Sequence, residues 1–355
     1  MDEERRAFLG KLLGIPSPSG FEAEAAACWR SEAERFADRT WWDIHGNSYA
    51  SVNEQGGPVI MLAAHIDEIG MVITNIDDRG FLRFEQNGYD LQGLPGQRVR
   101  ISGTDGPILG VIGRKTVQWQ TNAEKRKAVA VEDLWIDIGA RSRGGAAKHL
   151  EIGAPAVIDA SFSLLGDGAA VARGFDDRVG AFVVVESLRL AAMREPKARI
   201  VGVATVQEEV GTRGAQTSAY KLNPDVCIVV DVGNINDMPG MESFRQQQGD
   251  RCLGAGPLIT RGPNTNPELF DLLCSTADSH EIPYQVRASS RLTGTDANPI
   301  QVTRGGVATA LVSIPTRYMH SPSEVIHLDD IEYAAQLIAH VAAAIEAESS
   351  RFVPD

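Results

Sequence analysis

Two adjacent glutamates, Glu208 and Glu209, stand where an apolar run ends in the segment VATVQEEVGTRGA, residues 203–215. A buried carboxylate costs free energy unless a hydrogen bond or a cation compensates its charge. On an extended segment, the two side chains would point in opposite directions. One could then bind a metal ion while the other acts as a general base toward a metal-bound water. A solvated surface pair is the common alternative.

Apolar runs elsewhere in the chain also begin or end with residues of metal-binding type. The candidates are His65, Asp67, Asp176, Asp177, Asp231 and His320. Functional groups of open α/β sheets gather beyond the carboxyl ends of the strands, so we expect these side chains to lie together. Imidazole and carboxylate groups are ligands of zinc and similar divalent metals. Each residue alone has a structural alternative, such as a helix cap, but the whole set would be a cluster of like charges that needs cations or raised pKa values.

His65 and Asp67 are separated by one residue at the end of the apolar run 58–67. On a strand, this spacing places both side chains on the same side. The pair is either a hydrogen-bonded surface pair or a metal-binding histidine whose second ring nitrogen is oriented by a carboxylate.

Helical and strand-like segments alternate along much of the chain. Apolar runs at 58–67, 198–206, 225–233 and 305–315 predict buried strands, and helices are predicted at 2–13, 21–37, 180–193, 266–280 and 328–348. This alternation predicts an α/β fold with a mainly parallel sheet in three αβα layers. Short segments joined by turn signals between 68 and 163 predict a small inserted β-unit. The main domain is therefore expected to comprise residues 1–67 and 164–355.

The composition excludes some classes of partner. The 355 residues include 34 Lys and Arg against 47 Asp and Glu, a formal net charge of -13. This balance disfavours nucleic acid and anionic membranes as partners and is typical of a cytoplasmic protein. The start MDEERRAFLGKLLG indicates an amphipathic helix rather than a signal peptide. Four cysteines without C-x-x-C spacing predict free thiols.

Six motifs occur in one order along nearly the whole chain: AAHIDEIG, GFDDRVG, QEEVGTRGA, VVDVG, GTDA and MHSPSEVIHLDDIE. In this order the sequence resembles the M42 family of metal-dependent aminopeptidases, which includes the glutamyl aminopeptidases and the tetrahedral (TET) peptidases. The resemblance implies a phosphorylase/hydrolase-like αβα catalytic domain with an inserted small β-barrel, a PDZ-like domain for dimerisation. It also implies two divalent metal ions per subunit, with zinc as the first candidate and cobalt or manganese as others.

The resemblance also implies a role for each site residue. His65 and Asp231 would hold one metal, and Glu209 and His320 the other. Asp176 would bridge the two metals, because related peptidases place the bridge four residues before the helix glycine, here Gly180. Asp177 is the alternative for the bridge, Asp67 would orient His65, and Glu208 would be the general base. The implied reaction is hydrolysis of the N-terminal residue from short peptides by a metal-activated water.

Two other functions remain open from the sequence. One is a glycoside hydrolase that uses Glu208 with a second carboxylate, and the other is a non-catalytic, metal-stabilised oligomer. The resemblance implies a dimer-based homo-oligomer, with a twelve-subunit tetrahedral shell as one form. Asn264 stands where family members often carry histidine, which bears on the preferred N-terminal residue of the substrate. The other five histidines match no ligand motif.

Overall fold

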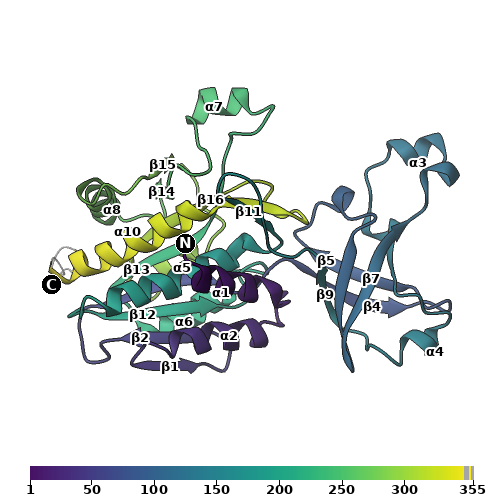
Figure 1. Ribbon diagram of the computed structural model, residues 1–355, viewed down its shortest axis with the longest axis horizontal. Helices are drawn as coiled ribbons and strands as arrows, with labels where there is room; N and C mark the ends of the chain where they lie inside the picture. Colours follow the sequence, from purple (N-terminus) through teal and green to yellow (C-terminus); the bar gives the residue numbers. More distant parts are fainter. Residues whose placement is uncertain (348–351, 353–355) are drawn as a thin grey trace.

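The computed structural model describes residues 1–347 and 352 (Figure 1). Its main sheet has eight strands in the order β1-β2-β12-β3-β13-β16-β14-β15. The neighbours β12, β3, β13 and β16 run parallel to one another. The bounds of the eight strands are β1 (Arg39–Trp42), β2 (Ser48–Val52), β3 (Val59–His65), β12 (Arg199–Thr205), β13 (Val226–Asn234), β14 (Leu258–Arg261), β15 (Gln285–Ala288) and β16 (Ala308–Thr316).

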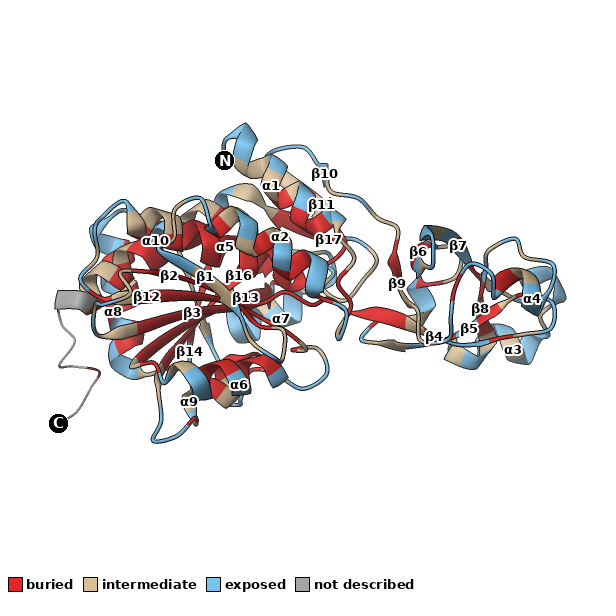
Figure 2. Cartoon of the chain, turned by 90° about the horizontal axis from the view of Figure 1, so that it is seen from below, coloured by how far each residue is buried: buried red, intermediate tan, exposed pale blue. Residues whose placement is uncertain are grey.

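Helices cover both faces of this sheet. One face carries α1 (Glu3–Gly14), α2 (Ala23–Ala33), α5 (Phe175–Ala192), α8 (Pro267–Ser279) and α10 (Leu328–Ala347). The other face carries α6 (Arg213–Leu222) and α9 (Ala297–Gln301), as Figure 2 shows. Each face has its own apolar core: Ile60 and Leu62 of β3 belong to one cluster, and Met61 and Ala63 belong to the other. A strand buried on both faces is apolar throughout, which is the pattern that the sequence showed.

A closed barrel of six strands is inserted between β3 and the rest of the main domain. Figure 1 shows that it projects away from the main sheet. Its strands are β4 (Gly70–Ile76), β5 (Leu82–Asn87), β6 (Arg98–Gly103), β7 (Gly106–Arg114), β8 (Leu134–Asp137) and β9 (Pro155–Ile158), and the short helices α3 (Asn122–Arg126) and α4 (Arg143–Ala146) lie between them in sequence. The α/β fold with an inserted β-barrel is therefore confirmed, whereas the domain limits 68 and 163 stay a prediction.

A small three-stranded sheet joins distant parts of the chain near the sheet edge where the predicted site residues gather. It consists of β10 (Ser163–Leu164), β11 (Ala169–Ala172) and β17 (Glu324–His327). Its register pairs Ala172, which precedes α5, with Glu324, which follows the loop of His320. A further helix, α7 (Glu242–Gln248), extends from the main body (Figure 1).

Two sequence-based boundaries need correction. Strand β12 ends at Thr205, so Glu208 and Glu209 lie in the following loop rather than on an extended strand. The helix predicted to begin at Gly180 begins at Phe175, although Asp176 and Asp177 within its first turn have non-helical backbone dihedrals. By contrast, the helix predicted at 266–280 is observed as α8, and the Asn266 side chain caps it by accepting two backbone N–H bonds at its start.

Two further properties hold for the described part of the chain. All four cysteines are free, as predicted. None of the helices there is long and apolar enough to cross a membrane.

Candidate active site

The predicted site residues meet at one edge of the main sheet. They line a cavity of about 210 Å³ together with residues of the loops around them. The site residues in its wall are His65, Asp176, Glu208, Glu209, Asp231 and His320. The parallel pairing of β3 with β12 helps to bring these residues together, because His65 at the end of β3 lies opposite Thr205 at the end of β12. Asp67 and Asp177 are fully buried just behind this wall.

Asp176 lies between the two histidines. Its Oδ1 is 3.1 Å from Nε2 of His65, and its Oδ2 is 3.1 Å from Nε2 of His320. Burial acts to raise the pKa of Asp176, but the hydrogen bonds with His320 and His65 outweigh it and lower the pKa. One carboxylate thus faces an imidazole with each of its oxygens.

Asp177 has a different environment from Asp176. Its Oδ2 accepts a hydrogen bond from the backbone N–H of His65 at 3.3 Å, and its Oδ1 accepts one from Gly180 at 3.1 Å. A Cβ atom on Gly180 would lie 2.3 Å from Oδ1 of Asp177, so only glycine permits this approach. Burial and repulsion from Asp231 raise the pKa of Asp177 well above its usual value.

Three overlapping groups have the spacing of a metal site, with one candidate atom from each residue within 4.8 Å of the others. The groups are His65, Asp177 and Asp231; His65, Glu208 and Glu209; and Asp176, Glu209 and His320. The third contains three of the expected ligands, and Glu209 Oε1 lies 3.4 Å from Nε2 of His320. That oxygen is buried and accepts no hydrogen bond from any described residue. A buried acceptor without a donor, set among imidazoles and carboxylates, fits a divalent cation.

The carboxylates of the cavity repel one another. Burial, followed by repulsion from Asp231, raises the pKa of Glu208 to about 9, although the nearby His65 opposes the shift. Burial likewise raises the pKa values of Glu209 and Asp231. A cation would favour the ionised forms and remove this penalty.

The expectation that Glu208 and Glu209 point apart is wrong. An oxygen of each lies within 4.8 Å of the other and of a ring nitrogen of His65. The reason is that both residues lie in the loop after the end of the strand. Gln207, directly before them, has a left-handed backbone with a φ of 58°. Strand alternation therefore does not apply to them.

Asp67 makes more contacts than the sequence suggested. Nδ1 of His65 is 3.0 Å from the backbone carbonyl of Asp67 and 3.4 Å from its Oδ1. The carboxylate also accepts hydrogen bonds from the backbone N–H groups of Glu208 and Glu209, at 3.0 and 3.2 Å. Asp67 therefore contacts both the histidine and the loop of the glutamates.

Sequence reasoning missed Glu324. Its Oε2 accepts a hydrogen bond from the backbone N–H of Asp176, and its Oε1 accepts one from His320, each at 3.0 Å. The side chain is buried, and burial raises its pKa to about 8. The available signal was its position four residues after His320 within the motif MHSPSEV.

Asp296 of the GTDA motif was also left without a role. It is buried, its Oδ2 accepts a hydrogen bond from the hydroxyl of Thr205, and its Oδ1 has no partner among the described residues. Burial raises its pKa to about 6.

Asn264 is buried and does not line the cavity. Its side chain binds Asn298 and accepts hydrogen bonds from the backbone and hydroxyl of Thr293, which does line the cavity. Any effect of Asn264 on substrate preference is therefore indirect. None of the five remaining histidines lines the cavity; His327, for example, contacts the backbone carbonyl of Asp167.

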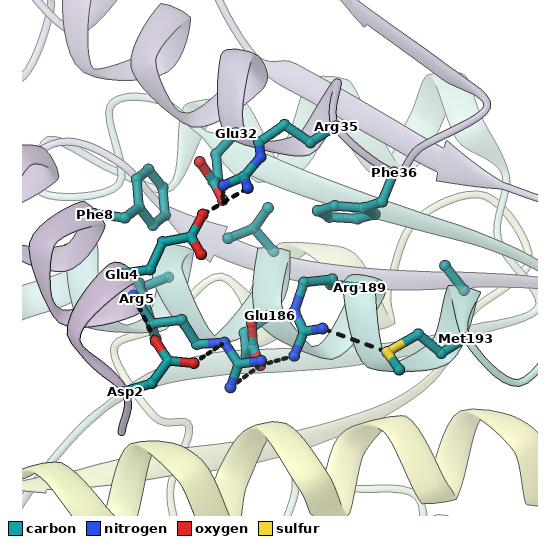
Figure 3. Close-up of a pocket in the computed structure, with 13 residues that line it drawn as sticks. Asp2, Glu4, Arg5, Phe8, Glu32, Arg35, Phe36, Glu186, Arg189 and Met193 are labelled. Atoms are coloured by element: carbon teal, nitrogen blue, oxygen red, sulfur yellow. Dashed lines mark hydrogen bonds and ion pairs between the residues drawn. The ribbon is translucent and has the colours of Figure 1, made fainter.

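A larger cavity of about 480 Å³ lies between α1, α2 and α5 (Figure 3). Its charges are matched within the wall: Arg35 pairs with Glu4 at 2.6 Å, and Arg189 pairs with Glu186 at 2.7 Å. The smaller cavity at the sheet edge is thus the one with unmatched carboxylates.

Known proteins resemble this chain over most of its length. A family model described as M42 glutamyl aminopeptidase matches residues 46–337. The lysyl aminopeptidase of Pyrococcus furiosus is 35% identical, over 93% of this chain and 94% of that protein. The structure of a TET aminopeptidase from a marine sediment archaeon of the Thaumarchaeota is 32% identical and covers 98% of each chain, with a TM-score of 0.92.

A second solved structure is that of the Pyrococcus horikoshii TET1 peptidase, which can assemble into a tetrahedron or a large octahedral shell. It is 30% identical and covers 95% of this chain and 99% of that chain, with a TM-score of 0.83. The extent of the family match and the identity to these relatives show that the chain belongs to the M42 family of aminopeptidases.

Proposed function

We propose that the protein is an aminopeptidase that removes the N-terminal residue of short peptides with two divalent metal ions. Membership of the family supports the peptidase activity. The observation that carries the two-metal proposal is the Asp176 carboxylate, which faces His65 with one oxygen and His320 with the other. Its two oxygens are suited to join two metal sites.

The remaining ligands divide between these two sites. His65 and Asp231 would hold one metal, and Glu209 and His320 the other, with Asp176 between them. Both Asp177 oxygens already accept backbone N–H groups, which favours Asp176 over Asp177 as the bridge. Zinc is the first candidate, and cobalt and manganese accept the same ligands.

When bound, such metals polarise the peptide carbonyl and lower the pKa of water. Glu208 is the proposed general base: it lines the cavity and lies 3.9 Å from Nε2 of His65. It would take a proton from the attacking water and later deliver it to the leaving amine. Asp67 and Glu324 would act as positioning residues, because their carboxylates hold the backbone of the groups that line the cavity.

The test compares metal-free and metal-loaded protein on aminoacyl p-nitroanilides. Dialysis against a chelator should abolish turnover, and zinc, cobalt or manganese should restore it. Glu208→Gln should keep the metals and the assembly but lower kcat by at least about 100-fold. Activity that survives full metal removal would overturn the proposal, and cellulose turnover would instead support a glycoside hydrolase. Wild-type protein that binds metals but cleaves no substrate would support a non-catalytic oligomer.

We also propose a dimer-based homo-oligomer that forms through the inserted barrel, with the tetrahedral dodecamer as one form. Strand β7 of the barrel exposes Leu109 and Val111, and the following segment exposes Val117 and Trp119. Exposed apolar side chains of this kind favour a protein interface. Sedimentation of the full chain tests this, and a monomer at micromolar concentration would contradict it.

Peptides are the proposed partners of the protein, and neither nucleic acid nor a membrane is proposed as one. The cytoplasm stays the predicted location.

A further inference from the structure

One arginine stands out in the wall of the active-site cavity. Arg287 of β15 is the single Lys or Arg among the described residues that line it. It shares the wall with polar or small residues, among them Asn234 and Thr293. None of these three residues is a proposed metal ligand.

Arg287 has no salt-bridge partner within the part of the chain that the structure describes. It forms no ion pair or side-chain hydrogen bond with any residue that the structure describes. The cavity carboxylates contact His65 and His320 instead. The positive charge of two divalent cations would exceed the negative charge of the three proposed carboxylate ligands. The ligands therefore do not require Arg287 to neutralise their charge. The arginines in Figure 3, by contrast, are paired within their own cavity.

A second arginine lies near Arg287. Arg251 is 7% exposed, forms no ion pair, and has a buried Nε without a partner among the described residues. The Gln285 side chain of β15 binds both the N–H and the C=O of Cys252, the residue after Arg251. This contact holds the backbone next to Arg251 against the strand that carries Arg287. Burial, and then repulsion from Arg287, lower the pKa of Arg251. Arg251 does not line the cavity. The repulsion shows, however, that its guanidinium group adds positive charge near Arg287.

We propose that Arg287, supported by Arg251, forms a subsite that binds a carboxylate of the peptide substrate. The proposal rests on the aminopeptidase function above. A guanidinium group binds a carboxylate through two parallel hydrogen bonds, which gives both charge and shape selectivity. The carboxylate has two possible sources: the side chain of an N-terminal Glu or Asp, or the C-terminus of a dipeptide.

The experiment separates the two sources with matched neutral substrates. Glutamyl and glutaminyl aminomethylcoumarin differ in the charge of the first side chain and have no free C-terminus. Leu-Gly and Leu-Gly-amide differ only in the charge of the C-terminus. The metal-loaded wild type should prefer the charged member of one pair. Arg287→Gln should lower the ratio of kcat/KM for the charged member to kcat/KM for the neutral member about 10- to 100-fold.

A binding measurement complements the rates. If the first side chain supplies the carboxylate, free L-glutamate should inhibit the wild type better than L-glutamine does, and Arg287→Gln should remove the difference. Arg287→Lys, which keeps the charge but loses the two-pronged geometry, should recover part of the preferred ratio.

A matched control is Arg291→Gln, which removes the same charge from an exposed residue that does not line the cavity. It should change neither ratio by more than about 3-fold, since exposed charges are screened by salt. The subsite is disproved if leucyl substrates are cleaved but Arg287→Gln changes neither ratio. If the metal-loaded wild type cleaves none of the substrates, the failure belongs to the proposed aminopeptidase function.

Discussion

The backbone N–H of Glu208 donates a 3.0 Å hydrogen bond to Oδ1 of Asp67, although 141 positions separate the two residues in the sequence. Oδ2 of the same carboxylate accepts hydrogen bonds from the backbone N–H of Glu209 and from the hydroxyl of Ser19. Asp67 thus fixes the loop that carries both glutamates. Their positions depend on this contact and not on the alternation of a strand.

Asp67→Asn should lower kcat/KM about 10- to 100-fold, as is common when a residue that orients metal ligands is replaced. An amide has one acceptor oxygen, so one backbone N–H of the glutamate loop would face an NH₂ group. Steady-state kinetics of the metal-loaded variant on an aminoacyl p-nitroanilide measure the effect. Unchanged kinetics would show that the position of this loop does not limit the reaction.

Asp330→Asn is the matched control for Asp67→Asn. Asp330 is also fully buried and also accepts two backbone N–H groups, from Gly254 and Gly256, each at 2.8 Å. It does not line the active-site cavity. The control should lower the melting temperature while the folded protein keeps its kcat/KM, which separates loss of stability from loss of loop position.

Asp176→Asn and Asp177→Asn should differ in bound metal. Asp176 faces both histidines, so its replacement should reduce the metal content from about two ions per subunit to one or none. Both Asp177 oxygens accept backbone N–H groups, so Asp177→Asn should mainly lower the melting temperature. Elemental analysis after dialysis measures the metal content. Retention of two ions by Asp176→Asn, with loss in Asp177→Asn, would identify Asp177 as the bridge.

Glu324→Gln should weaken metal binding about 10- to 100-fold without removing any ligand. The glutamine can accept only one of the N–H groups of Asp176 and His320, which Glu324 now holds with separate oxygens. Competition with a chelator of known affinity measures the change, and excess metal should restore much of the activity. Loss of activity that excess metal does not restore would point to a role other than positioning these two residues.

The sequence predicted the α/β fold because β3, β12, β13 and β16 are buried on both faces and are therefore apolar throughout. It also predicted which side chains gather, since the carboxyl ends of the parallel strands share one edge. The directions of Glu208 and Glu209 could not be predicted, because they depend on a loop held by a distant residue. For these residues, side-chain type was a better guide than position within a strand.

Contacts that depend on tertiary pairing escaped the sequence in the same way. Glu324 reaches Asp176 because β17 pairs with β11, and this pairing joins segments about 150 residues apart in the sequence. Arg287 lies on a four-residue strand at the end of the sheet order. So short an element gives little periodicity, and no motif marks its side chain as part of the cavity wall.

The metal-free protein should lose stability as the pH rises from about 5 to 8. Burial raises the pKa of Glu324 to about 8 and that of Glu208 to about 9, from ordinary values near 4.5. Within this window the folded state holds protons that the unfolded chain has released, so the free energy of unfolding falls as the pH increases. His320 acts in the same direction: the neighbouring Asp176 and Glu209 carboxylates raise its pKa to about 11. Its stabilising contribution is therefore complete below about 6.5, the ordinary value for histidine, and is lost progressively as the pH rises from there toward 11.

Urea unfolding of chelator-treated protein at pH 5 and pH 8 tests this sign. One carboxylate with a raised pKa contributes at most about 1.4 kcal/mol per pH unit. A decrease of about 2 kcal/mol is therefore expected after allowance for relaxation around the buried groups. Glu324→Gln should reduce the decrease because the amide does not titrate, and bound metal should suppress it by favouring the ionised carboxylates. A metal-free protein that is more stable at pH 8 than at pH 5 would show that the cluster is not held protonated in the folded state.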